Sequence, residues 1–264
     1  GDLMADITNK KAIALNLEEK NWIALLPGSK KVKLSVGIPY FLEMADHIYN
    51  KDKNINMIIP IAPTTSIKEY LFFQSNQNPI AKYYSSKIKK IKPIKNSIFD
   101  YVIETSKKTK IYLSHKHPCH EILKNCDLAI TTVGANTAEL AAISLPMIVV
   151  LPTQHLNVMN AWDGIFGIIG KISFINKLIT FLIKNWYLRK KKFFAWPNIK
   201  AQKLITPERI GNISPKQIAK EVIFLINNQE YLKKQKDSLS KQRGETGAVK
   251  KLAYIIFDTI KKLG

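Results

Sequence analysis

The chain has 264 residues, of which 46% are hydrophobic and 23% are charged, so it can form a folded core and is not globally disordered. Its formal net charge of +21 at pH 7 favours anionic partners: a nucleotide, a nucleic acid or an anionic membrane surface. Lysine dominates arginine, the usual reader of base edges, so the charge fits diffuse attraction better than sequence-specific DNA binding. A genomic bias toward lysine codons explains the excess equally well. The two cysteines, Cys119 and Cys126, exclude a disulfide framework.

The first predicted unit is a strand, a loop and a helix. Residues 1–20 are expected to form a connecting segment. The apolar run 22–26 has the length of a strand, and Pro27-Gly28-Ser29 ends it. Apolar residues then recur at helical spacing over 34–49, which predicts a helix with one inward face. A loop in this position can lie against phosphates, although turns of this kind are common between strands and helices.

Shorter elements follow. Strands are predicted over 55–61 and 110–114, and a short helix over 65–73. Residues 74–108 have the weakest pattern, and their lysine-rich part, 87–95, predicts either a mobile basic loop or an edge strand with solvated lysines.

A small group of histidines precedes the middle of the chain and suggests a metal site: His115, His117, Cys119 and His120. No carboxylate or second cysteine pair completes a zinc shell, so we expect no metal. Pro118 is expected to begin a short helix over 119–125 instead.

The chain is organised around residues 127–151, which read as strand, tight turn, helix and second strand. The strands are predicted over 127–131 and 147–151, and the helix over about 135–144, where Pro146 ends it. Gly134 permits the sharp turn, and Asn136 or Thr137 can cap the helix.

The turn at Gly134 directs backbone N–H groups and the positive end of a helix dipole at one point, which suits a phosphate. Glu139, about one and a half turns into the helix, can accept hydrogen bonds from a ribose beside that phosphate. On spacing alone, an ordinary solvent-facing glutamate is an equally good interpretation. Gln154 or His155, after the second strand, can contact the nucleotide, or can be a cap or surface residue.

Residues 165–196 combine apolar bulk, aromatic residues and the basic cluster 189–192. Lys171 and Lys177 argue against a membrane-spanning helix. The pattern favours a helix lying in a membrane surface, with packing against another domain as the alternative.

The last part of the chain predicts one strand and several helices. The strand is expected over 201–205. A helix is expected over 215–226, and its inward face carries Ile218, Val222 and Leu225. Residues 231–262 are expected to be helical with an interruption around 244–247.

Three blocks of sequence resemble the lipid-A-disaccharide synthases, a family of GT-B glycosyltransferases. The central block is Gly134-x-x-Thr137-x-Glu139, followed by Leu145-Pro146-Met147-Ile148-Val149-Val150. Leu25-Leu26-Pro27-Gly28-Ser29-Lys30 is similar to the family's L-L-P-G-S-R block. Trp196-Pro197-Asn198, followed by Leu204-Ile205-Thr206-Pro207-Glu208, is similar to its L-P-N and V-P-E-L blocks. The resemblance covers nearly the whole chain, but only the C-terminal half of the family's two-domain enzyme.

The resemblance implies an α/β fold: a Rossmann-like parallel sheet flanked by helices, as in the C-terminal half of a GT-B fold. It implies a linker at 1–20, a nucleotide-sugar-binding domain at 21–228 and C-terminal helices at 229–264. The apolar-basic stretch at 165–196 departs from the shorter family version and is expected to be a helical insertion in that domain. We expect the chain to be a fragment that lacks an N-terminal domain.

The implied activity is a step of lipid A biosynthesis: transfer of an acylated glucosamine from a UDP carrier to a lipid-linked acceptor. The implied partners are the UDP-sugar, that acceptor, an anionic membrane surface and the N-terminal domain, with no nucleic acid and no cofactor. The implied location is cytoplasmic, peripheral on the inner face of a membrane.

The resemblance also assigns a donor site. It places Gly28, Ser29 and Lys30 near the diphosphate, Gly134 and Thr137 at the second phosphate-facing turn, and Glu139 on the ribose, with Asn198 and Glu208 lining the same cleft. Lys30 replaces the family's arginine, which keeps the charge but loses the bidentate fork. No catalytic base is assigned, because the family's base belongs to its N-terminal domain.

A non-catalytic module that binds a nucleotide or an anionic lipid is the alternative. Nucleic-acid binding by charge alone is a third interpretation, and no recognition motif supports it.

Overall fold

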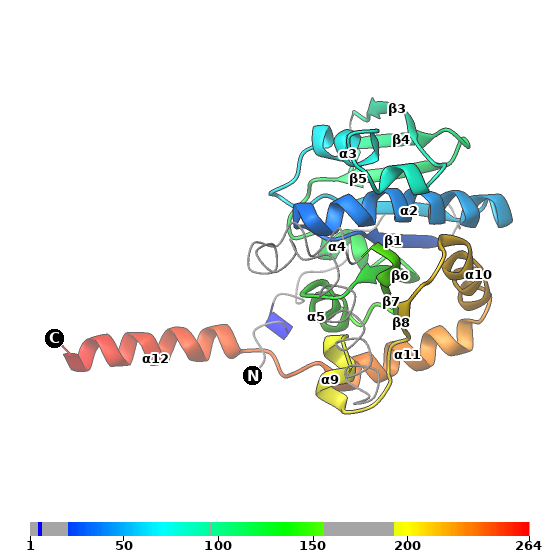
Figure 1. Ribbon diagram of the computed structural model, residues 1–264. Helices are drawn as coiled ribbons and strands as arrows, with labels where there is room; N and C mark the ends of the chain where they lie inside the picture. Colours follow the sequence, from blue (N-terminus) through cyan, green and yellow to red (C-terminus); the bar gives the residue numbers. More distant parts are fainter. Residues whose placement is uncertain (1–4, 7–20, 96, 156–192, 264) are drawn as a thin grey trace, which may run out of the picture.

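The computed structural model describes residues 5–6, 21–95, 97–155 and 193–263, and it shows one mixed β-sheet with helices on both faces (Figure 1). The eight strands lie in the order β3-β4-β5-β2-β1-β6-β7-β8. The strands are β1 Trp22–Leu26, β2 Asn56–Pro60, β3 Ile88–Pro93, β4 Tyr101–Thr105, β5 Lys110–Ser114, β6 Leu128–Thr132, β7 Met147–Pro152 and β8 Glu208–Gly211. The helices are α2 Lys31–Lys51, α3 Ile67–Gln74, α4 His120–Leu123, α5 Asn136–Ala142, α9 Trp196–Ala201, α10 Pro215–Ile226, α11 Gln229–Gln242 and α12 Ala248–Leu263. Short 3-10 turns are η1 Ala81–Tyr83 and η2 Thr153–His155.

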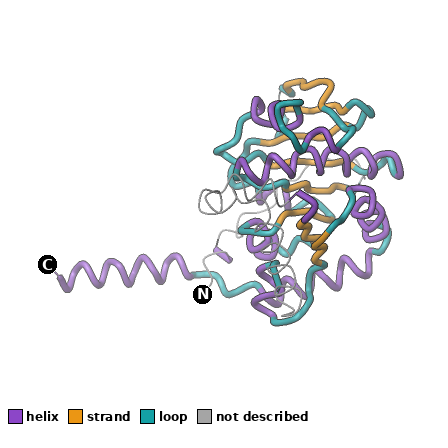
Figure 2. Tube along the Cα trace, in the orientation of Figure 1, coloured by secondary structure: helices purple, strands orange, loops and turns teal. Residues whose placement is uncertain are grey.

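The predicted α/β fold is confirmed, and the parallel part of the sheet has the Rossmann strand order. Strands β1, β2, β5, β6, β7 and β8 are mutually parallel and, numbered along the chain, lie in the order 3-2-1-4-5-6. In Figure 2 these strands form one continuous layer between helices. The chain order therefore reverses between β1 and β6, which is where sheets of this kind bind ligands.

The sheet departs from the predicted all-parallel arrangement at one edge. Strand β4 pairs antiparallel with β5, and β3 pairs antiparallel with β4. The lysine-rich stretch thus forms an edge strand, in which Ile88 is buried and Lys89, Lys90 and Lys92 are exposed. Charged lysines discourage further strand pairing at such an edge. Strand β4 has no counterpart among the predicted elements.

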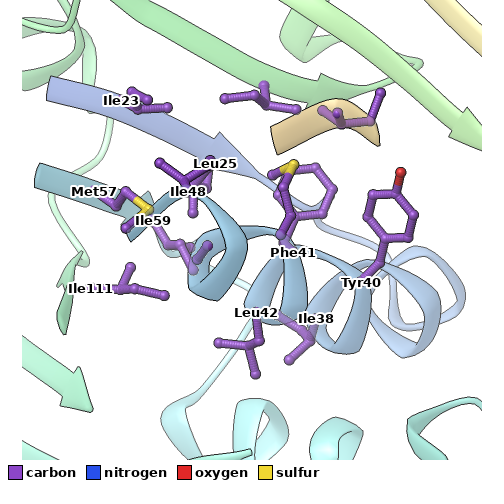
Figure 3. Close-up of a cluster of buried hydrophobic side chains, with 14 of the residues drawn as sticks. Ile23, Leu25, Ile38, Tyr40, Phe41, Leu42, Ile48, Met57, Ile59 and Ile111 are labelled. Atoms are coloured by element: carbon purple, nitrogen blue, oxygen red, sulfur yellow. The ribbon is translucent and has the colours of Figure 1, made fainter. Parts of the chain in front are cut away.

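Each face of the sheet has its own hydrophobic core because successive side chains of a strand point to opposite faces. In β1, Ile23 and Leu25 pack with α2, α3 and α10, whereas Trp22, Ala24 and Leu26 pack with α4 and α5. Figure 3 shows the first core, where residues of α2 meet those of β1, β2 and β5. The predicted inward face of α2 is buried throughout.

Two local predictions were wrong. The last strand is β8 rather than 201–205, and residues Trp196–Ala201 form α9 instead. The backbone N–H groups of Ile205 and Thr206 donate to Asn198 Oδ1, so they are not available to a sheet ladder. Helix α5 has Ala135 at its N-cap and no side-chain capping bond, so neither Asn136 nor Thr137 caps it.

The C-terminal helices agree with the prediction. Helix α10 has the predicted bounds, and Ser214 and Gln217 form a reciprocal capping box at its start. Helix α11 packs on the body through Leu232 and Leu239, whereas α12 extends away from it (Figure 1). The insertion predicted at 165–196 lies outside the described residues up to 192, and the domain bounds remain predictions. Within the part of the chain that is described, no helix is both long and apolar enough to span a bilayer.

Candidate functional site

The candidate site lies at the carboxyl ends of β1 and β6, which are neighbours in the sheet. The turn after β1 leads directly into α2, a helix of 21 residues, and the turn after β6 leads into α5. Both turns contain a glycine in the left-handed region, with φ +114° at Gly28 and +140° at Gly134. Few L-residues adopt these angles cheaply, so the sequence folds into these two turns only because glycine is present.

Lys33 joins the two turns. Its Nζ donates a hydrogen bond to Val133 O at 2.7 Å, which ties the first turn of α2 to the loop after β6. A Cβ added at Gly28 would lie 2.7 Å from Lys33 Cβ, and one added at Gly134 would lie 2.9 Å from Lys33 Nζ. The aliphatic stem of Lys33 therefore lies beside the Gly28 turn and its ammonium group beside the Gly134 turn, where an anion would meet it.

Lys30, the lysine that the family resemblance selected, lies elsewhere. It is the N-cap residue of α2 and is exposed. Lys33 was not among the site residues predicted from the sequence. The signal that could have found it is helical spacing, because Lys33 follows the N-cap by three residues and so returns to the face above the turn.

One cavity of about 300 Å³ extends from these turns across the ends of β2 and α4. Three of the predicted residues, Gly28, Ser29 and Glu139, line it together with His117 and His120. Glu139 contributes a carboxylate whose side chain is 40% exposed, and the rest of the wall includes apolar residues such as Leu26, Ile61 and Leu123. A mainly apolar pocket with a few placed polar groups is typical of a small-molecule site.

A second cavity, of about 260 Å³, is lined by Lys33. Its wall is largely apolar and is formed by α2, the ends of β6 and β7, and Phe194. Tyr40 and Thr132 contribute hydroxyl groups to this wall, and the Tyr40 hydroxyl is buried without a hydrogen-bond partner among the described residues. Lys33 lines this apolar cavity, whereas the cavity that contains Glu139 has several polar groups in its wall and does not include Lys33.

Three of the predicted donor-site residues belong to an internal network instead. Thr137 donates its hydroxyl to Gly134 O at 2.8 Å and accepts from the backbone N–H of Trp196 at 3.0 Å. Asn198 is fully buried and donates to Glu208 Oε1 at 2.7 Å. Glu208 also accepts from the backbone N–H groups that precede α9.

This network explains the resemblance of the Trp196–Glu208 block in structural terms. The side chains of Asn198 and Glu208 fix the start of α9 and the entry to β8, and Thr137 joins α9 to the Gly134 turn. None of the three is among the described residues that line either cavity. We therefore expect these three residues to affect ligand binding only indirectly, through the position of the Gly134 turn.

The two candidates after β7 also bond to the protein. Gln154 Nε2 donates to Ile213 O at 3.0 Å. His155 is buried, its Nε2 lies 2.8 Å from the hydroxyl of Tyr84, and burial lowers the pKa of its imidazole. The structure brings neither residue to the cavity that contains Glu139.

The histidine group does not form a metal site within the described residues, where no cluster of three histidine, cysteine, aspartate or glutamate ligands occurs. His115 instead faces Asp100, with 3.6 Å between His115 Nδ1 and Asp100 Oδ2. Cys119 is buried, and this burial raises the pKa of its thiol to about 12, so it is a poor thiolate ligand.

Fold and site together define an α/β domain with the Rossmann strand order and two glycine turns joined by a lysine at the switch point. No family model matches the chain. The chain is similar to the lipid-A-disaccharide synthase of Sulfurihydrogenibium sp. (strain YO3AOP1), with 24% identity over 249 residues, 93% of this chain and 53% of that protein. It is also similar to the lipid-A-disaccharide synthase of Wigglesworthia glossinidia brevipalpis, with 26% identity over 232 residues, 86% of this chain and 46% of that protein.

These relatives confirm the resemblance that the three sequence blocks indicated. The chain spans about half the length of the curated relatives it matches. Among solved structures, TarM has a TM-score of 0.46 at 10% identity over 94% of this chain and 36% of its own. A putative UDP-N-acetylglucosamine 2-epimerase from Listeria monocytogenes has a TM-score of 0.41 at 13% identity over 84% of this chain and 41% of its own.

Proposed function

We propose that this chain is the donor-binding half of a membrane-associated glycosyltransferase similar to lipid-A-disaccharide synthase. The observation that carries the proposal is the convergence of Gly28, Gly134, Lys33 and Glu139 at the switch point of a Rossmann-ordered sheet. The relatives supply the reaction class, since their names specify formation of a disaccharide.

The proposed donor is a UDP-sugar that binds as a substrate. Its diphosphate lies against the Gly28 and Gly134 turns, where Lys33 and the N-terminus of α2 supply positive charge. Its ribose extends into the cavity of about 300 Å³, where the Glu139 carboxylate accepts from the two ribose hydroxyls. Charge that builds up on UDP as it leaves the sugar is stabilised by the same lysine, which is how this half contributes to catalysis.

The apolar cavity that Lys33 lines supports an acylated sugar as the transferred group. Its wall of Val36, Phe41, Val150 and Leu151 suits a hydrocarbon chain carried next to the diphosphate. The general base and the acceptor pocket belong, in this proposal, to an N-terminal half of the enzyme.

The proposed acceptor is linked to a lipid, so the enzyme must work at a membrane surface. The net charge of +21 and the apolar-basic sequence over 165–196 support a peripheral position on an anionic cytoplasmic leaflet. This part of the proposal rests on sequence.

A second candidate is a non-catalytic module that holds a nucleotide or an anionic lipid. The formal net charge of +21 favours an anionic ligand of either kind. The upstream reading frame distinguishes the two candidates: a Rossmann-like half with a glycine-rich loop supports the enzyme, and a start codon next to Gly1 supports the module.

Glu139→Ala tests the donor site. Loss of the ribose contacts should weaken UDP binding by about 1–3 kcal/mol, because the hydroxyls lose a charged acceptor. Isothermal titration of both proteins with UDP measures this difference. Glu230→Ala is the matched control, since the Glu230 side chain is 77% exposed on α11 and lines neither cavity. Equal affinities for wild type and Glu139→Ala would remove the ribose role.

A further inference from the structure

His120, the first residue of α4, is buried with its polar atoms unused. The residue is 6% exposed, and neither Nδ1 nor Nε2 has a hydrogen-bond partner among the residues that the structure describes. Buried ring nitrogens normally find a partner, because leaving them unpaired costs desolvation free energy without return. A histidine in this state needs a reason beyond packing.

The carboxylate of Glu139 lies close to its ring. His120 Nε2 lies 3.7 Å from Glu139 Oε2, which is beyond hydrogen-bonding distance. The two residues come from different helices, α4 and α5, and both line the cavity of about 300 Å³. His120 is held by its surroundings, whereas the Glu139 side chain is 40% exposed and has rotamer freedom.

A small movement of the carboxylate would close this gap. A hydrogen bond between these atoms needs a separation of about 2.7–3.2 Å, so a shift of roughly 0.5–1 Å by Glu139 is sufficient. A carboxylate has enough acceptor positions to take one bond from an imidazole N–H and others from the two hydroxyls of a ribose. A fixed partner also reduces the side-chain freedom that must be lost when the ligand binds.

We propose that His120 is a positioning residue: its Nε2–H holds the Glu139 carboxylate in the orientation that accepts the vicinal hydroxyls of a bound ribonucleotide. The inference rests on the proposed function, because it assumes that Glu139 binds ribose. The inference also predicts the specificity of the site. Because His120 fixes the Glu139 carboxylate that accepts both ribose hydroxyls, the site should favour ribonucleotides over 2′-deoxyribonucleotides.

The test is a double-mutant cycle on the present chain, with UDP and 2′-deoxy-UDP as ligands. His120→Leu should weaken UDP binding about fivefold to tenfold, as expected for loss of one hydrogen bond to a charged group, and should weaken 2′-deoxy-UDP binding less. In the Glu139→Ala background the same change should have no further effect. His120→Gln, which returns an N–H donor, should recover part of the loss.

His115→Leu is the matched control, because His115 is a nearby exposed histidine that does not line the cavity. A direct readout is the ¹⁵N spectrum of the imidazoles, in which UDP should shift the Nε2 signal of His120. If wild type binds UDP and Glu139→Ala weakens it, but His120→Leu binds both ligands as wild type does, the positioning role is wrong and the proposed function stands. If wild type does not bind UDP, the proposed function fails, and this inference fails with it.

Discussion

Lys33 is a residue of the candidate site that the structure shows and the sequence did not predict. Its ammonium group bonds to the loop after β6 and lies beside the Gly134 turn, while its aliphatic stem lies beside the Gly28 turn. A single charge between two turns can attract a diphosphate and also hold the turns together in its absence. These two roles predict different consequences of replacement.

We expect Lys33→Met to weaken UDP binding by about 1.5–3 kcal/mol, the range for a hydrogen bond to a charged group. Lys30→Met is the control, because Lys30 has the same charge but is exposed at the N-cap of α2. Calorimetric titration with UDP compares the two variants. Thermal unfolding of each shows whether the loss comes from the fold. A larger effect of Lys30→Met than of Lys33→Met would return the phosphate role to Lys30.

Gly134 is the second residue whose backbone serves the site. Its φ of +140° is strained for any L-residue, and a Cβ there would meet Lys33 Nζ at 2.9 Å. Gly134→Val should cost about 1–3 kcal/mol in free energy of unfolding through backbone strain, and it should displace the lysine as well. We therefore expect it to damage UDP binding more than folding. Urea denaturation measures the loss of stability, and UDP titration measures the loss of binding. A variant that does not fold would show that the turn is needed for folding before it is needed for binding.

At the scale of elements, the antiparallel edge is attached to α2 by carboxylates. Asp46 is fully buried and accepts hydrogen bonds from the hydroxyls of Ser86 and Thr105. Glu43, one turn earlier, accepts from the backbone N–H groups of Ser85 and Ser86. These contacts join residues 40 to 59 positions away in the sequence to the helix that begins at the candidate site.

Glu43 makes this attachment sensitive to pH. Burial raises the pKa of its carboxylate, but hydrogen bonds from Ser86 and Ser85 and the charge of Lys107 outweigh burial and hold that pKa below its ordinary value. A carboxylate whose pKa is lower in the folded state stabilises the fold above the ordinary value of 4.5. That contribution is lost as the pH falls through the lowered pKa.

We therefore expect Glu43→Gln to be less stable than wild type at pH 7, and the difference to shrink as the pH falls below about 4.5. Chemical denaturation of both proteins across this range measures the difference in free energy of unfolding. Comparing the two removes the contributions of other carboxylates. A difference that does not change with pH would show that Glu43 acts through packing rather than charge.

At the scale of the whole molecule, the positive charge and the sequence over 165–196 are the basis for the proposed membrane attachment. Each basic residue near an anionic surface contributes about 1 kcal/mol, so Arg189, Lys190, Lys191 and Lys192 together contribute roughly 4 kcal/mol before screening. Salt should weaken this part, whereas burial of apolar residues should persist.

We expect the chain to float with anionic vesicles, less so at high salt, and replacement of Arg189, Lys190, Lys191 and Lys192 by Gln to weaken flotation. UDP binding should be unchanged, because the glycine turns and Glu139 lie in other parts of the sequence. Neutral vesicles are the control for charge. If wild type does not float, or the Gln variant floats equally well, the segment more plausibly packs on protein, with an N-terminal half as the partner.

The sequence by itself determined the elements whose signals are local. The apolar run of β1, the strand–turn–helix–strand around Gly134 and the capping signals of α10 each depend on neighbours within a few residues, so their type and approximate bounds could be predicted. The same holds for Gly28, Ser29 and Glu139, which the structure brings to one cavity because their turns follow adjacent parallel strands.

Tertiary structure alone decided the contacts between distant segments. Lys33 meets Val133 across 100 positions, and Asn198 and Glu208 bond to each other and to the start of α9 rather than lining a cleft. Strand β4 and the antiparallel edge likewise depend on pairing with β5, which the weak pattern of 74–108 does not reveal. The physical reason is that strand order and helix packing set these contacts, while periodicity and turn residues report only local backbone preference.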